Sequence, residues 1–214
     1  AGSGLVSISL ADKGYTGTIT ACDRNLDCMR ELPDHQKIVK RPCTDSRALP
    51  FDAGNFDAVV CRFTFHYIEH KMETLKEFWR VMTDNGILLY SDAVLPDHSK
   101  TVLNRLYHIR EDHFHGYLGY HETIELMGQS GFQVILARPY KYRYASFRIY
   151  LEGVDDGSSK DVPHAFSDRL KSKLEMAWKH LDEKTKREMG IEPHNLSSGL
   201  SYHVLDLALK KSQA

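Results

Sequence analysis

The sequence predicts an open α/β fold, in which helices cover both faces of a mostly parallel sheet. Three observations lead to this prediction. β-rich apolar runs alternate with helix-like runs over most of the 214 residues, a glycine-containing turn opens the chain, and an acid follows the next strand. The turn is Ala1-Gly2-Ser3-Gly4 and the acid is Asp23. This layout is typical of a nucleoside-binding βαβ unit.

The opening turn is the first element. Glycine lets the backbone approach a ligand, and the acid after the next strand can accept hydrogen bonds from ribose hydroxyls. Asp23 lies 19 residues after Gly4, close to the spacing of about 20 found in such units. Because the turn should follow a strand, we expect that a first strand precedes Ala1. The alternative is a glycine-containing N-terminus followed by an ordinary helix.

The next elements follow from local signals. Pro33 closes a short helix over residues 26–32, and a short strand follows at 37–40. The continuous apolar run at 56–61 predicts a strand buried on both faces. Apolar residues at a spacing of three or four predict a helix over 69–82, which the turn Asp84-Asn85-Gly86 ends. A strand over 86–92 comes next.

The second half is less regular. We expect helices at 99–110 and 120–130, a strand from 132 to about 137 that alternating tyrosines extend to Tyr144, and a polar loop at 155–160. The strongly amphipathic run 166–187 predicts a helix, either a packing helix or a cover over an apolar acceptor. A final strand is expected at 201–209.

Composition limits the class of protein. The length of 214 residues predicts one domain, and a hydrophobic content of 42% is ordinary for a globular protein. The net charge is −1, so we expect no nucleic-acid partner. No apolar run reaches the ~18 residues of a membrane span. The four cysteines, Cys22, Cys28, Cys43 and Cys61, have no metal-ligand spacing and indicate a reduced, cytoplasmic protein. His66 and His70 are four apart, and we interpret them as a surface pair at a helix start rather than a metal site.

Taken together, these residues resemble the class I S-adenosylmethionine-dependent methyltransferases, and most of all the ubiquinone/menaquinone C-methyltransferases. The most specific element is Asp45 followed by Leu49-Pro50-Phe51 and then Phe56-Asp57-Ala58-Val59. Arg80-Val81-Met82 before Gly86 matches the family's helix-to-strand junction. The resemblance is good from Ala1 to about Val94 and weaker beyond.

The resemblance implies a fold: a Rossmann-like, doubly wound, mostly parallel seven-stranded sheet, its first strand absent from this chain and its last strand antiparallel. It also implies one methyltransferase domain over residues 1–214, with a cofactor-binding half at 1–94 and a substrate-side half at 95–214. The cofactor would be S-adenosyl-L-methionine and the acceptor a small molecule, possibly of aromatic or quinone-like type.

Roles carry over residue by residue. The cofactor-binding set is Ala1, Gly2, Ser3, Gly4, Asp23, Arg24, Asp45, Ser46 and Cys61. Asp23 would bind the ribose hydroxyls, Asp45 the adenine amino group, and the Ser46 N–H an adenine ring nitrogen. Alternatively, Asp23 is a solvated strand end and Asp45 caps a turn.

Catalysis by this class is mostly positioning of an electrophilic methyl group. Arg62 could stabilise an anionic acceptor, and His113 could act as a base because histidine titrates near neutral pH. Substrate contacts are expected from His66, Tyr67, His115 and Tyr117.

Three other functions stay open. One is a relative that binds the cofactor or a partner without transferring methyl. A nicotinamide-dependent oxidoreductase is disfavoured because Ser7, not glycine, lies three residues after Gly4. Nucleobase methylation is disfavoured because Cys61-Arg62-Phe63-Thr64 replaces the Asn/Asp-Pro-Pro-aromatic signature.

Overall fold

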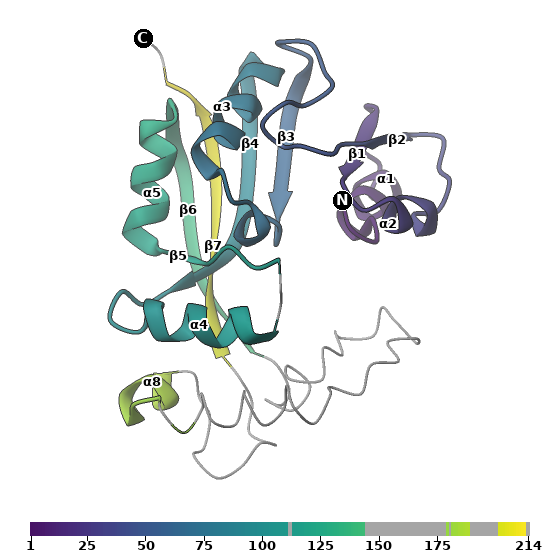
Figure 1. Cartoon of the computed structure of the whole chain (residues 1–214). Helices are drawn as coiled ribbons and strands as arrows, with labels where there is room; N and C mark the ends of the chain where they lie inside the picture. The colour runs from purple at the N-terminus through teal and green to yellow at the C-terminus, as the bar shows by residue number, and fades with distance from the viewer. Residues whose placement is uncertain (111–112, 144–178, 180, 189–200, 213–214) are drawn as a thin grey trace. The chain divides into compact units, whose positions relative to one another are not determined.

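The structure is a computed structural model that describes residues 1–110, 113–143, 179, 181–188 and 201–212 (Figure 1). The chain divides into two compact units, an N-terminal unit, Ala1–Asp52, and a C-terminal unit, Ala53–Ala214. We describe each unit by itself.

The N-terminal unit is a small α/β element. Its elements in order are α1 (Leu5–Asp12), β1 (Ile19–Asp23), α2 (Leu26–Glu31) and β2 (Ile38–Pro42). Strands β1 and β2 pair in parallel from Ile19 opposite Ile38 to Asp23 opposite Pro42. The helices bury their apolar side chains against this pair, in a core made of Ala11, Ala21, Met29, Leu32 and Ile38.

Local chemistry sets both helix starts in this unit. Helix α2 begins at Asn25, whose side chain accepts hydrogen bonds from the N–H groups of Asp27 and Cys28, as helix caps do. Helix α1 begins after Gly4, which has a φ of 81°. A Cβ atom at Gly4 would overlap the side chain of Leu32. Only glycine fits this position, because both its backbone conformation and its space exclude a side chain.

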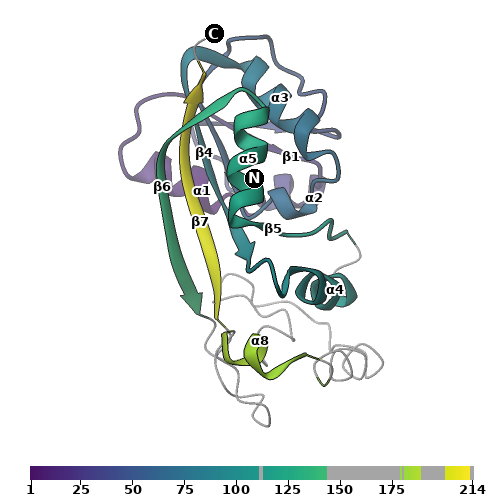
Figure 2. The ribbon, with the colours of Figure 1, turned by 90° about the vertical axis from the view of Figure 1, so that its left-hand side faces the viewer.

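The C-terminal unit is built on a mixed sheet with strand order β3-β4-β7-β6, and β5 pairs with β4. Its elements are β3 (Phe56–Arg62), η1 (Phe65–Tyr67), α3 (Lys71–Val81), β4 (Met82–Leu95), α4 (Lys100–Arg110), β5 (Leu118–Gly119), α5 (Tyr120–Gln129), β6 (Phe132–Arg143), α8 (Glu183–Glu188) and β7 (Ser201–Lys211). Figures 1 and 2 show α3 and α5 along the same face of this sheet.

The predicted α/β architecture with an antiparallel last strand agrees with the structure, and the larger sheet is mixed rather than mostly parallel. The strands form two sheets, and among the described residues no strand pairs with both. Parallel pairing holds within β1–β2, β3–β4 and β4–β5. The last strand, β7, is antiparallel as predicted, and because it inserts between β4 and β6 it makes the larger sheet mixed.

The predicted start of the strand after the helix is also wrong. Asp84-Asn85-Gly86 does not form a turn, because β4 starts at Met82 and runs through these residues. A Cβ at Gly86 would approach the carbonyl oxygens of Thr83 and Phe56 to 3.0 and 3.2 Å. Between the pairs Phe56–Met82 and Ala58–Ile87, β4 carries the extra residues of a bulge, and Gly86 allows this bulge to approach β3 closely.

The amphipathic helix predicted over 166–187 lies mostly outside the described residues, and its end is interrupted. Leu181 and Asp182 are not helical. The Asp182 carboxylate accepts hydrogen bonds from the N–H and hydroxyl of Thr185, at 2.8 and 2.7 Å. Asp182 thus caps the start of the short helix α8. The expected loop at 155–160 is likewise outside the described part of the chain.

Candidate functional site

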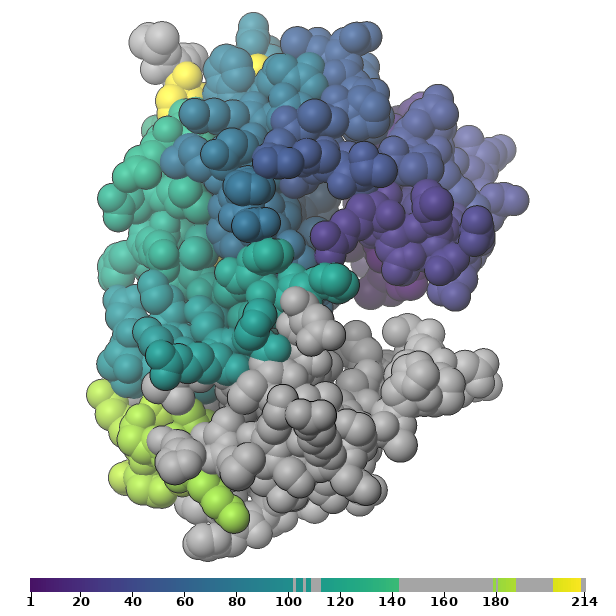
Figure 3. Space-filling view, viewed as in Figure 1, coloured from purple at the N-terminus to yellow at the C-terminus, as the bar shows by residue number. Residues whose placement is uncertain are grey.

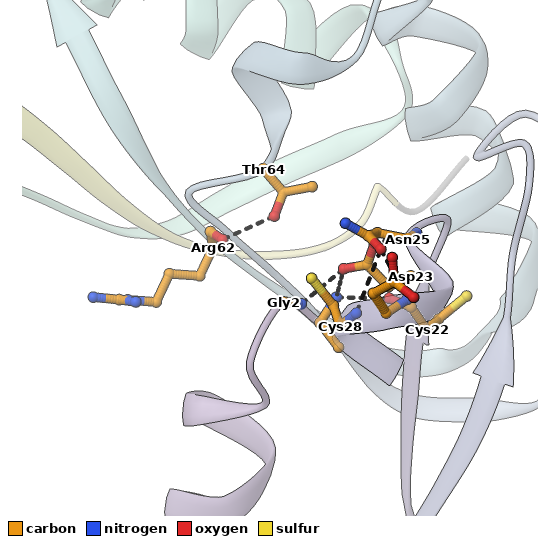
Figure 4. A network of polar contacts seen from close by, with 9 residues as sticks. Gly2, Cys22, Asp23, Asn25, Cys28, Arg62 and Thr64 are labelled. Atoms are coloured by element: carbon orange, nitrogen blue, oxygen red, sulfur yellow. Dashed lines mark hydrogen bonds and ion pairs between the residues drawn. The ribbon is translucent and has the colours of Figure 1, made fainter. Parts of the chain in front are cut away.

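Asp23, the acid predicted to bind ribose, ends β1 in the N-terminal unit. Its Oδ2 atom accepts hydrogen bonds from the Gly2 N–H and the Ala1 amine, both at 2.7 Å, and its Oδ1 atom accepts from the Asn25 N–H at 2.9 Å (Figure 4). Burial alone would raise the pKa of Asp23, but these hydrogen bonds bring it below its ordinary value. The carboxylate is therefore ionised and tied to the glycine turn.

Two glycines accompany Asp23 at this corner. Gly2 and Gly4 both have a positive φ, and a Cβ at Gly2 would meet no atom within 4 Å. A carboxylate has about four lone-pair sites, and the N–H groups of Gly2 and Asn25 take one on each oxygen of Asp23. Arg24, the next residue, is exposed.

Asp45, predicted to accept from adenine, lies in the segment after β2. Its carboxylate is paired with Arg47, whose Nη2 lies 2.8 Å from Oδ2 and whose backbone N–H donates to Oδ1 at 2.9 Å. Both side chains are partly exposed. The pairing is what a turn-capping aspartate makes, and each carboxylate oxygen accepts two hydrogen bonds from Arg47. Ser46 beside it is half-buried.

The last two residues of β3 are Cys61, which has a buried thiol, and Arg62, which has an exposed cation. Cys61 is buried, and burial, followed by the nearby charge of Asp92, raises its pKa well above the ordinary value. Arg62 is exposed, with its guanidinium 4.5 Å from the centre of the Phe63 ring. The Thr64 hydroxyl donates to the Arg62 carbonyl at 3.0 Å (Figure 4). Arg62 is thus available to an anionic ligand, whereas Cys61 stays a neutral packing residue.

His66 is the best-organised titratable side chain at this edge. It lies in η1, directly after β3, and its Nδ1 is 2.8 Å from Oδ1 of Asp92 on β4. The His66 N–H also donates to Oδ2 of Asp92 at 3.1 Å, and the Ala93 N–H donates to Oδ1 at 2.8 Å. Because β3 and β4 are parallel, with Arg62 opposite Ser91, both partners lie just beyond the carboxyl end of β3. Open α/β sheets bind ligands at this edge.

Aromatic rings surround the His66 imidazole. Ring-centre distances are 4.1 Å to Tyr67, 4.6 Å to Tyr117 and 5.9 Å to Phe114. Phe114 and Tyr107 are buried beneath, while Tyr67 and Tyr117 are half-buried. The imidazole therefore sits in an aromatic cluster made of Tyr67, Tyr107, Phe114 and Tyr117.

The loop between α4 and β5 is held in place by backbone hydrogen bonds. The His115 N–H donates to the His66 carbonyl at 2.8 Å. Asn104 of α4 both donates to the Tyr117 carbonyl, at 2.9 Å, and accepts from its N–H, at 3.0 Å. Figure 3 shows α4 and α5 as one continuous surface of this unit. The backbone of Tyr117 is thereby anchored to α4, while its ring packs against the imidazole.

The predicted side chains at this edge are only partly brought together. His66, Tyr67 and Tyr117 are in contact, but the side chains of His113 and His115 are exposed. The interpretation of His66 and His70 as a surface pair is wrong: His66 is buried on Asp92, whereas His70 is exposed at the start of α3. Sequence reasoning missed Asp92, although an acid at the end of an apolar strand was a usable signal.

Two negative findings apply to the described ranges only. No group of three or more histidine, cysteine, aspartate or glutamate side chains there is arranged to hold a metal ion. Among the same residues, no helix combines the length and the apolar character that crossing a bilayer requires.

Residues 1–90 match the sequence model of a family described as a methyltransferase domain. A search of curated protein sequences finds no significant match. Among solved structures, BH2331 of Bacillus halodurans C-125 aligns with a TM-score of 0.84 at 16% identity, over 99% of this chain and 90% of that one. YcgJ of Bacillus subtilis aligns with a TM-score of 0.78 at 15% identity, over 100% and 90%.

A third structure is described as an S-adenosylmethionine-dependent methyltransferase. It comes from Methanosarcina mazei and aligns with a TM-score of 0.60 at 16% identity, over 100% of this chain and 90% of that one. Fold, glycine turn and family match agree. The chain has the Rossmann-like fold of these structures. Its residues 1–90 are similar to a methyltransferase domain, and this similarity indicates an enzyme whose cofactor is S-adenosyl-L-methionine.

Proposed function

We propose that this enzyme methylates a small aromatic or quinone-like acceptor, bound at the carboxyl ends of β3 and β4. The observation that carries the proposal is the aromatic cluster around His66, with two half-buried tyrosines at the surface. Flat aromatic rings pack well against such side chains, in offset or edge-to-face geometry. The exposed Arg62 nearby in the sequence adds a cation that suits a phenolate or a carboxylate.

Each unit has its own task in this proposal. When bound, S-adenosylmethionine supplies an electrophilic methyl group. In the N-terminal unit, Asp23 would hold the ribose, while Gly2 and Gly4 allow the backbone to approach. Asp45 and Ser46 would contact the adenine. In the C-terminal unit, Tyr67 and Tyr117 would orient the acceptor, and orientation supplies most of the rate enhancement in such displacements.

The test is an assay for release of S-adenosylhomocysteine with a panel of phenols, quinols and small aliphatic acids. We expect turnover with members that carry an aromatic ring and none with the aliphatic acids. Turnover of the aliphatic acids alone would contradict the aromatic acceptor. Replacing Tyr117 with Leu keeps an apolar side chain but removes the aromatic ring, and should raise KM for the aromatic acceptor more than it lowers kcat.

A further inference from the structure

We propose that His66 and Asp92 form a proton-accepting pair, and that the acceptor is therefore an aromatic compound with an ionisable hydroxyl. This inference rests on the proposed function and specifies its chemistry. In it, His66 Nε2 takes the hydroxyl proton and Asp92 positions the imidazole. The tautomer of His66, the rigidity of the pair, the groups around it and the proton balance all support this role.

The Asp92 contact determines which ring nitrogen is free. An ionised carboxylate only accepts hydrogen bonds, and Asp92 faces Nδ1 of His66 with both oxygens, at 2.8 and 3.0 Å. Nδ1 must then carry the hydrogen, so Nε2 of the neutral ring has a bare lone pair. Within the described part of the chain, no hydrogen bond to Nε2 is formed. Nε2 is therefore available as a base.

The pair is rigid because the backbone fixes both partners. Asp92 receives two backbone N–H groups, from His66 and Ala93, in addition to the imidazole. The His66 carbonyl accepts from the His115 N–H. Both side chains are buried, with 6% and 2% of their surface exposed. A base held in this way loses little freedom when it meets an acceptor, which is the requirement for efficient proton transfer.

The groups around the imidazole favour this role. The titratable or charged residues that approach the pair are Tyr67 of η1, Tyr117 before β5, Lys71 of α3, Cys61 of β3 and Tyr90 of β4. Burial first, and then the charge of Asp92, raise the pKa values of Cys61 and Tyr90, so both stay neutral. Burial lowers the pKa of Lys71, and its Nζ donates to the Ile68 carbonyl at 2.6 Å.

The proton balance is complete without another reactant. The O–H bond of the acceptor breaks and the new bond is Nε2–H on His66, so the acceptor becomes a phenolate. The imidazolium is stabilised by the Asp92 carboxylate 2.8 Å away. When bound, S-adenosylmethionine would supply the methyl group that such a phenolate accepts and would become a neutral thioether, and His66 would pass its proton to water. An acceptor without an acidic hydroxyl would have no proton for His66 Nε2 to accept.

The decisive experiment measures binding rather than turnover. The protein, saturated with S-adenosylhomocysteine, is titrated with 4-nitrophenol at a pH below the pKa of the free phenol, and absorbance reports the phenolate. We expect the wild-type protein to bind the dye as phenolate. His66→Asn retains a donor to Asp92 but has no base, and should bind it roughly tenfold more weakly and only as neutral phenol. His121→Asn changes an exposed residue of α5. It is the matched control and should behave as wild type.

A second measurement addresses positioning by Asp92. In protein labelled with ¹⁵N-histidine, long-range ¹H–¹⁵N spectra should show His66 with a protonated Nδ1 and a bare Nε2 at neutral pH. Asp92→Asn should shift the ring toward the opposite tautomer while far-UV circular dichroism is unchanged. If Asp92→Asn does not fold, the wild-type spectrum still decides the matter, because a protonated Nε2 would overturn the proposal.

The remaining outcomes separate this inference from the proposed function. Binding of S-adenosylhomocysteine without any binding of 4-nitrophenol, or binding of the dye only in its neutral form, overturns the proton-accepting pair and leaves the cofactor site intact. Failure to bind S-adenosylhomocysteine would instead contradict the proposed function itself. 4-Nitroanisole, which has no hydroxyl, should bind wild type and His66→Asn equally.

Discussion

At the scale of single residues, three carboxylates that look alike in the sequence have different surroundings. Asp23 is tied to the backbone of the glycine turn, Asp45 is paired with the Arg47 side chain, and Asp92 is buried against an imidazole. Hydrogen bonds from fixed backbone groups leave a carboxylate in one orientation, whereas a partly exposed arginine can move. Asp23 and Asp92 are therefore the two acids whose geometry is prepared for a ligand or a proton.

The first prediction concerns cofactor affinity. Asp23→Ala removes charge-assisted hydrogen bonds to ribose worth about 1.5–3 kcal/mol, so S-adenosylhomocysteine should bind at least about tenfold more weakly. Asp45→Ala should have a smaller effect, because one amino group loses one acceptor that Arg47 already shares. Isothermal titration calorimetry measures both. Unchanged affinity in the two variants would show that neither acid binds the cofactor.

The pKa of Asp23 adds a pH dependence to the same measurement. Its value is lower in the folded protein than the ordinary 3.8. A depressed carboxyl pKa contributes stability above the unfolded value, and this contribution is lost as the pH falls through the folded value. The difference in stability between wild type and Asp23→Ala should thus be constant near neutrality and shrink only below about pH 4. A difference that grows on acidification would contradict this assignment.

At the scale of elements, the C-terminal unit shows how a local signal places a helix. Helix α5 begins at Gly119, and the Glu122 carboxylate reaches back to the Gly119 N–H at 3.1 Å. The Thr123 hydroxyl donates to the Gly119 carbonyl at 2.8 Å. Burial would raise the pKa of Glu122, but hydrogen bonds from Lys100 and Gly119 bring it below 4.5. The helix start, and with it the end of the loop that carries Tyr117, depends on this carboxylate.

The second prediction tests that dependence. Glu122→Ala should lower the free energy of unfolding by about 0.5–2 kcal/mol at neutral pH, the range for loss of a helix cap. Urea denaturation followed by circular dichroism measures the change. Glu125→Ala, in the same helix and with only an exposed contact to Gln129, is the control. The loss should disappear as the pH falls through the lowered pKa of Glu122. An equal loss in both variants would argue against capping.

At the scale of the whole molecule, the residues assigned to the cofactor and those assigned to the acceptor belong to different compact units. The ribose acid and both glycines are in the N-terminal unit, and the His66–Asp92 pair is in the C-terminal unit. Asp23, Arg62 and His66 lie at or just after the carboxyl ends of strands, and Gly2 and Gly4 lie in the turn that opens the chain. The candidate site residues therefore come from several separate segments of the chain.

The third prediction concerns cofactor choice. A ligand that binds only the native state stabilises it by about 2.7 kcal/mol at a hundredfold excess over Kd. S-adenosylmethionine and S-adenosylhomocysteine should therefore raise the melting temperature, measured by differential scanning fluorimetry, and NAD should leave it unchanged. Asp23→Ala should reduce the rise. A rise with NAD and none with the sulfonium compound would contradict the family match.

The sequence by itself determined the elements and the class. Periodicity placed α3, α4 and α5 within about two residues, because burial of one helix face imposes its spacing on the sequence. The alternating tyrosines correctly predicted that β6 extends to Arg143, and the glycine turn with Asp23 led to the methyltransferase class. These features are local, so a single stretch of chain reveals each of them.

Only the tertiary structure decided what depends on contacts between distant residues. Nothing in the sequence joins His66 to Asp92, which lie 26 residues apart and meet because β3 and β4 are parallel and in register. The same holds for Gly86, whose close approach to the Phe56 carbonyl of β3 no local signal reveals. Strand pairing sets these relations, and pairing is a property of the folded chain, not of any one segment.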